Sequence, residues 1–141
     1  VGPLFKYAQF DHTRKLDYTP NKKAFDKQTK LLVRYFTAIK QALDQVSEDI
    51  WNNPLEYGVT KTTAVNAFLL VLNRLMEIKP EVDIDLESYL EPIKKICFRN
   101  RVIVRYGGGW EGFKGLANRI IRELNSKRPI KLKSYMPKKK K

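Results

Sequence analysis

The chain has 141 residues and carries 28 Lys and Arg against 15 Asp and Glu, which gives a net charge of +13 at pH 7. A domain of this size can bury a core without metals or disulfides. One cysteine and one histidine exclude an internal disulfide and a Cys/His zinc cluster. The longest apolar run, residues 67–72, is far shorter than the roughly 20 residues that span a bilayer. We therefore expect a soluble, cytoplasmic protein with no membrane partner.

Two long helices are predicted in the first two thirds of the chain. Residues 1–20, with aromatic side chains between prolines, predict an irregular N-terminal arm. Residues 21–46 place apolar side chains three and four apart after the capping residue Asn21, which predicts an amphipathic helix. Residues 62–78 are apolar nearly all round, so we expect them to form the central helix of a bundle. The expected cap of that helix is one of three threonines, Thr60, Thr62 or Thr63.

The rest of the chain predicts shorter helices and a basic tail. Pro92 and the acidic residues before it predict a short helix that is interrupted or restarts at the proline. Residues 98–106 fit either a short strand or a helix, and residues 113–125 predict a third clear helix. Residues 127–141 contain eight basic residues and two prolines, which predicts a tail that is disordered unless bound. The predicted fold is all-α, a single compact helical bundle over residues 21–126.

The positive charge is concentrated in the last third of the chain. Residues 1–96 contain 14 Lys and Arg and 13 Asp and Glu, whereas residues 97–141 contain 14 Lys and Arg and only two Glu. A local field of one sign attracts polyanions such as nucleic acids. The alternative is a solvated tail that only keeps the protein soluble.

The glycines at positions 107, 109 and 112 have the G-x-G-x-x-G spacing of dinucleotide-binding enzymes. Such a site needs an acidic residue about 20 positions later, at the end of a second parallel strand. No acidic residue follows Glu123, and Phe113 stands where the lysine of an NTPase phosphate loop would be. No other set of side chains predicts catalysis. We therefore expect no cofactor, no metal site and no enzymatic activity.

The same glycines allow a simpler way of binding phosphate. Consecutive glycines let main-chain amides point at one anion, and the start of the following helix adds its positive end. Neighbouring cations could contact phosphates, and aromatic rings could stack on an exposed base. The alternative is a flexible turn whose tryptophan packs on the core. The candidate nucleic-acid-binding residues are Arg99, Arg101, Arg105, Tyr106, Gly107, Gly108, Gly109, Trp110, Lys114, Arg119 and Arg122.

Four stretches, taken in order, resemble a known family. LLVRYFTAIKQAL, EDIWNN, KTTAVNAFLLVLNRL and YGGGWEGFKGLANRIIREL are similar to the helical C-terminal region of DGQHR-domain proteins, the DndB-like proteins associated with DNA modification. The resemblance covers residues 25–124, and the Asp-Gly-Gln-His-Arg stretch of the family is absent. It implies a partial chain from a DNA-modification or defence-linked protein of a prokaryote. The start at Val1 also leads us to expect a fragment of a longer protein.

The leading functional hypothesis is a non-enzymatic accessory domain that binds nucleic acid, with DNA favoured, through phosphate contacts from the basic last third. The alternative hypothesis is a protein-interaction or oligomerisation module in which the basic tail is incidental. In that case a protein partner would bind the N-terminal arm or a missing upstream domain.

Overall fold

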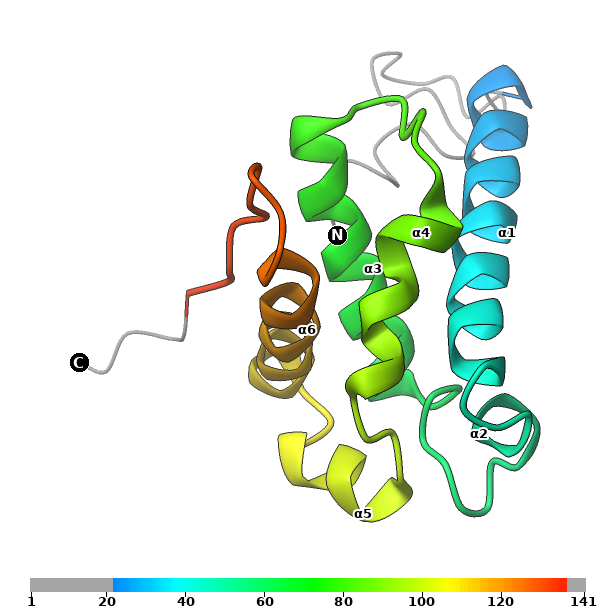
Figure 1. Cartoon of the computed structure of the whole chain (residues 1–141), viewed down its shortest axis with the longest axis vertical. Coiled ribbons are helices and arrows are strands. Elements are labelled where there is room, and N and C mark those ends of the chain that lie inside the picture. The colour runs from blue at the N-terminus through cyan, green and yellow to red at the C-terminus, as the bar shows by residue number, and fades with distance from the viewer. Residues whose placement is uncertain (1–21, 137–141) are drawn as a thin grey trace, which may run out of the picture.

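The computed structural model describes residues 22–136 (Figure 1), so the arm predicted at residues 1–20 lies outside the described part. The fold is all-α and forms a compact helical domain, as predicted. Between residues 22 and 136 there is no strand, and an isolated β-bridge joins Tyr57 and Arg99. The helices are α1 (Lys22–Asp44), α2 (Asp49–Asn52), α3 (Thr62–Ile78), α4 (Leu86–Leu90), the 3₁₀ helix η2 (Glu91–Lys95), α5 (Asn100–Ile103), the 3₁₀ helix η3 (Val104–Tyr106) and α6 (Trp110–Asn125).

Helix α1 follows the predicted amphipathic pattern. Its buried side chains are spaced by three and four residues, so they form one stripe along the helix. Tyr35 is fully buried, and its hydroxyl donates a hydrogen bond of 2.6 Å to the carbonyl oxygen of Phe68 in α3. The stripe therefore holds α1 against the core. The buried residues of α1 are Tyr35, Ala38, Ile39, Ala42 and Leu43.

Helix α3 is the central helix, as its apolar composition predicted. It lies between α1 and α6 behind α4 in Figure 1, and it packs side by side with α6. Helix α4 and η2 pack on α1, and η2 also contacts α6, so these segments cover the other side of the core. The buried residues of α3 are Ala64, Ala67, Phe68, Leu70, Val71, Leu72, Asn73 and Leu75.

The start of α3 corrects one prediction. The residue at the N-cap position is Lys61, and no side chain makes a capping hydrogen bond there. Thr62 and Thr63 lie inside the first turn, and the hydroxyl of Thr63 donates instead to the carbonyl oxygen of Gly107 at 3.0 Å. The predicted threonine cap is therefore wrong, because that hydroxyl has an acceptor in a distant loop.

The shorter helices agree with their sequence signals. Asp85 caps α4 and accepts hydrogen bonds from the main chain and hydroxyl of Ser88. Pro92 lies in the first turn of η2, where its missing N–H costs nothing. Residues 98–106 adopt the helical alternative from Asn100 onward, as α5 and η3.

The predicted disordered tail needs correction for residues 127–136. This segment turns back after α6 and then runs beside the helix (Figure 1). Leu132 is only 3% exposed and Tyr135 is half-buried. The segment is polar and basic in composition, but these two side chains pack against the core formed by the helices. Residues 137–141 lie outside the described part of the chain.

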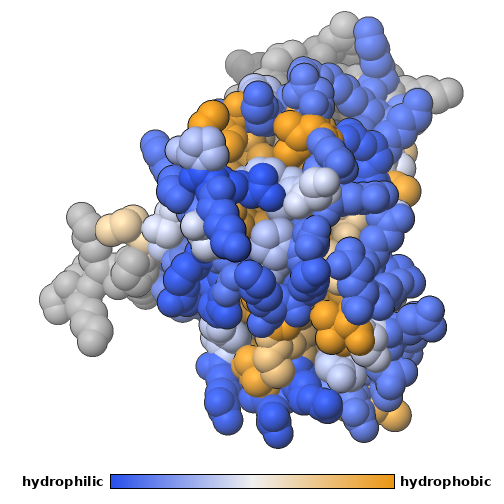
Figure 2. Space-filling view, in the orientation of Figure 1, coloured by the Kyte–Doolittle hydropathy of each residue, from blue (hydrophilic) through white to orange (hydrophobic). Residues whose placement is uncertain are grey.

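The face shown in Figure 2 is mostly hydrophilic, and its hydrophobic areas are small and separate. None of the described helices has the length and apolar character needed to cross a membrane.

Candidate nucleic-acid interface

Two of the three spaced glycines are required by the geometry of the chain. Gly107 has a φ of +86°, in the left-handed region that favours glycine. Gly112 is buried in the first turn of α6, and a Cβ atom there would come closer than 3.0 Å to the carbonyl oxygens of Tyr106 and Gly107. The spacing that resembles a dinucleotide loop thus serves a turn and a close approach between a loop and a helix.

The outer side of the loop remains open. Gly108 and Gly109 are exposed, and a Cβ atom on either would meet nothing within 4 Å. Within residues 22–136 their amides make no main-chain hydrogen bond, and Gly109, the N-cap residue of α6, provides no side-chain cap. Because the carbonyl oxygens of Tyr106 and Gly107 face Gly112, an anion could approach only the amides on the outer side.

Two arginines lie just before this loop. Arg101 in α5 and Arg105 in η3 are exposed and four residues apart in consecutive helical turns, which puts them on one side. Neither makes a side-chain hydrogen bond or an ion pair with any residue in the described part of the chain. Trp110 at the start of α6 is 55% exposed and packs edge-on against Phe113, with ring centroids 5.9 Å apart. We call Arg101, Arg105 and Trp110 the arginine–tryptophan surface.

Tyr106, also predicted for stacking, is less exposed than Trp110. Its ring packs partly buried against the core. A Cβ atom at Gly115 would lie 3.2 Å from the ring, so α6 passes close over it. Little of this ring is available to a base, and Trp110 is the better candidate for stacking.

Three predicted cations are paired with carboxylates. All three pairs are partly exposed, and exposed pairs of this kind contribute only about 0–1 kcal/mol to stability. A polyanion could therefore compete for these cations at low cost. The pairs are Arg99–Glu56 at 3.4 Å, Lys114–Glu111 at 2.9 Å and Arg119–Glu123 at 2.9 Å.

The candidate residues do not form one cluster. Arg122 is exposed in the last turn of α6, twelve residues after Trp110. At 1.5 Å per residue this places it about 18 Å farther along the helix axis. Arg119 lies at the same far end of the helix. The predicted set therefore divides between the two ends of α6.

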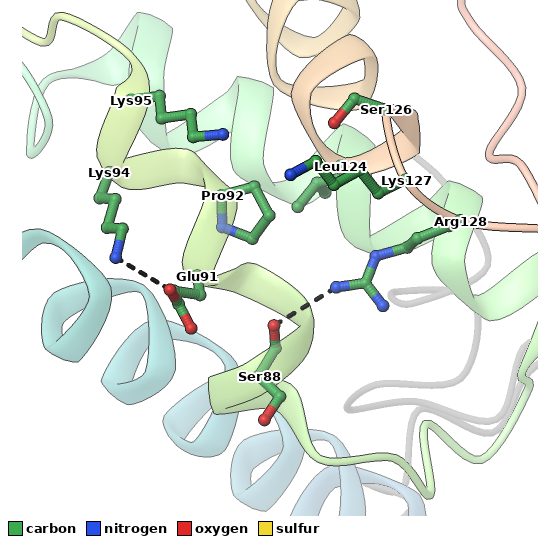
Figure 3. Close-up of a pocket in the computed structure, with 9 residues that line it drawn as sticks. All are labelled: Ser88, Glu91, Pro92, Lys94, Lys95, Leu124, Ser126, Lys127 and Arg128. Atoms are coloured by element: carbon green, nitrogen blue, oxygen red, sulfur yellow. Dashed lines mark hydrogen bonds and ion pairs between the residues drawn. The ribbon is translucent and has the colours of Figure 1, made fainter.

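A second group of cations surrounds a hollow of about 360 Å³ between α4, η2 and the end of α6 (Figure 3). In Figure 3 the side chains of Lys95, Lys127 and Arg128 point toward the space beside Pro92. Lys94 lines the same hollow and donates to Glu91 at 2.8 Å. The sequence prediction missed this group, because its members come from segments far apart in the chain.

The charges in the hollow also have structural roles. The hydrogen bond from Lys94 lowers the pKa of Glu91, so this carboxylate stays ionised and offsets one cation. Arg128 donates to the carbonyl oxygens of Ser88 and Tyr89 and stacks on the ring of Tyr89. The cations near the last turn of α6 also complement the negative end of that helix. The hollow is therefore a weaker candidate for phosphate than the arginine–tryptophan surface.

Among residues 22–136 no three His, Cys, Asp or Glu side chains come together in a way that could hold a metal ion. Cys97 is a free, exposed thiol. The site chemistry is thus that of cations, open amides and one exposed indole.

Comparison of the chain with known protein families, curated protein sequences and solved structures finds no match. The resemblance to DGQHR-domain proteins therefore stays a prediction. A function has to be argued from the geometry of the chain itself.

Proposed function

We propose that this domain is a non-enzymatic nucleic-acid-binding module that contacts the phosphate backbone, with DNA as its preferred target. The observation that carries the proposal is the arginine–tryptophan surface. Arg101 and Arg105 have no carboxylate partner among the described residues, and Trp110, which follows them in the chain after the glycine loop, is 55% exposed. Cations without partners and an exposed ring are what backbone contacts and base stacking require.

The energetics favour this surface over the ion-paired cations. An arginine with no partner breaks no ion pair when it binds phosphate, and each phosphate neutralised releases condensed counterions. The net positive charge of the last third would also speed the encounter with a polyanion. The preference for DNA rests on the resemblance to DNA-modification proteins.

The test compares two double variants that remove the same charge from different places. Arg101→Gln with Arg105→Gln removes the proposed contacts, and Lys23→Gln with Lys30→Gln removes two exposed cations from α1. The measurement is the affinity for a mixed-sequence duplex at several salt concentrations. The arginine variant should lower the slope of log affinity against log salt by about 2, because each phosphate contact contributes about 0.9.

The lysine variant should leave that slope nearly unchanged. Equal slopes for both variants would mean that only the net charge matters, and the proposed surface would then be wrong. Trp110→Ala should weaken binding to single strands more than binding to duplex, because stacking needs an unpaired base.

A further inference from the structure

We call the C-terminal segment of residues 130–136 the strap. Two asparagine side chains of α6 hold it by hydrogen bonds to its main chain. The side-chain amide of Asn125 donates to the carbonyl oxygen of Leu132 at 2.9 Å and accepts from its N–H at 2.8 Å. Asn118 does the same with Tyr135, at 2.8 and 2.6 Å. Each asparagine thus satisfies both polar main-chain groups of one strap residue, as a neighbouring β-strand would.

The spacing of these contacts matches the repeats of the two segments. Asn118 and Asn125 are seven residues apart, which is about 10.5 Å along a helix at 1.5 Å per residue. Leu132 and Tyr135 are three residues apart, which is one turn, or about 9 Å, of a polyproline II chain, whereas in a β-strand they would face opposite sides. An extended peptide that runs antiparallel to α6 therefore stays in register with the two asparagines.

The strap lies on both α6 and α3, and we call the surface that it covers the α3–α6 groove. Leu132 is buried, and the hydroxyl of Tyr135 donates to the carbonyl oxygen of Leu70 in α3 at 2.7 Å. Arg74 of α3 stacks on the ring of Tyr135, with its guanidinium carbon 3.9 Å from the centroid, and donates to the carbonyl oxygen of Ser134. Ile130, in contrast, is 58% exposed.

This groove therefore has the two parts of a peptide-binding site. The asparagines recognise any extended main chain, and the positions of Leu132 and Tyr135 select leucine and tyrosine three residues apart. Main-chain bonds for affinity with side-chain pockets for specificity are the usual way of binding an extended peptide. The strap of the chain itself is the segment that fits.

We propose that the α3–α6 groove also accepts the strap of a second copy of this chain, so that two copies exchange straps. Exchange of an identical element between copies keeps every contact and costs little. Arg128 is anchored on Ser88 and Tyr89, so residues 129–131 would carry the change of direction. This exchange does not depend on nucleic-acid binding.

The intact chain holds its own strap at a high effective concentration, on the order of millimolar for so short a connection. The wild-type protein should therefore remain monomeric at micromolar concentrations. Exchange becomes visible only when the competition within one chain is removed.

The test uses two full-length variants that complement each other. Leu132→Ala with Tyr135→Ala weakens the strap and leaves the groove intact, whereas Asn118→Ala with Asn125→Ala weakens the groove and leaves the strap intact. Analytical ultracentrifugation should find each variant monomeric alone and a 1:1 dimer when they are mixed. High salt should favour this dimer, because it screens the repulsion between two strongly positive chains.

A matched control replaces the strap variant with Ile130→Ala and Lys133→Ala, both at exposed positions. This variant keeps its own strap in place, so its mixture with the groove variant should remain monomeric. Circular dichroism confirms that each variant keeps its helices.

A labelled peptide of residues 130–136 tests the groove directly. It should bind the strap variant at least about tenfold more tightly than the wild type, in which the groove is occupied. Monomeric mixtures, with or without peptide binding, would overturn the exchange.

Discussion

The glycines of the loop have separate structural roles. The sequence shows three spaced glycines but not their separate purposes, since a turn, a close packing contact and an open amide all favour glycine. The structure separates them: Gly107 makes the turn, Gly112 allows α6 to pass the loop, and Gly108 with Gly109 stays open. Only the last pair remains available for an anion.

Gly112→Ala should therefore destabilise the fold. The added methyl group would meet the main chain of Tyr106 and Gly107, which cannot move as a side chain could. We expect the free energy of unfolding to fall by about 1–3 kcal/mol, the usual cost of overpacking. Urea denaturation with Gly108→Ala as the control, which should change stability by no more than about 0.5 kcal/mol, measures this. Equal effects at both positions would contradict the packing role.

At the level of the helices, the spacing of apolar residues predicts some elements of the fold and not others. The long helices α1, α3 and α6 could be predicted because apolar side chains recur at the helical period. The ordered strap could not, because its contacts with Asn118 and Asn125 depend on how distant segments meet. The sequence signal for the strap was a pair of asparagines, seven residues apart in a helix with one polar face. That signal is weak, since Asn66 and Asn73 of α3 have the same spacing.

The cap of α4 predicts a pH dependence. Hydrogen bonds from the hydroxyl and main chain of Ser88 lower the pKa of Asp85 from its ordinary value of 3.8. A carboxyl with a lowered pKa stabilises the fold above its unfolded-state pKa, and this contribution is lost as the pH falls through the folded-state value.

The difference in unfolding free energy between the wild type and Asp85→Ala should thus be largest above about pH 4 and shrink at lower pH. Urea denaturation of both proteins from neutral to acidic pH checks this, with Asp83→Ala as the control. A difference that does not change with pH would exclude the ionised cap.

At the scale of the whole molecule, the sequence identified the sign and region of the charge but not its distribution in space. Arg101 and Arg105 were predicted and are free of carboxylate partners among the described residues, whereas Arg99, Lys114 and Arg119 are paired. Ion pairing and the hollow near Lys127 depend on tertiary packing, which composition does not reveal. Removal of residues 127–141 should disturb the fold, because it removes the buried Leu132 and the strap contacts with α6.

The most direct test of the nucleic-acid proposal is the salt dependence of duplex binding by the full chain. A protein that makes about six phosphate contacts loses on the order of a thousandfold in affinity between roughly 50 and 200 mM salt. We predict binding at low salt with a steep loss of this order, and a shallower loss for Arg101→Gln with Arg105→Gln. Absence of binding at the lowest salt, or an affinity that does not change with salt, would contradict the proposal.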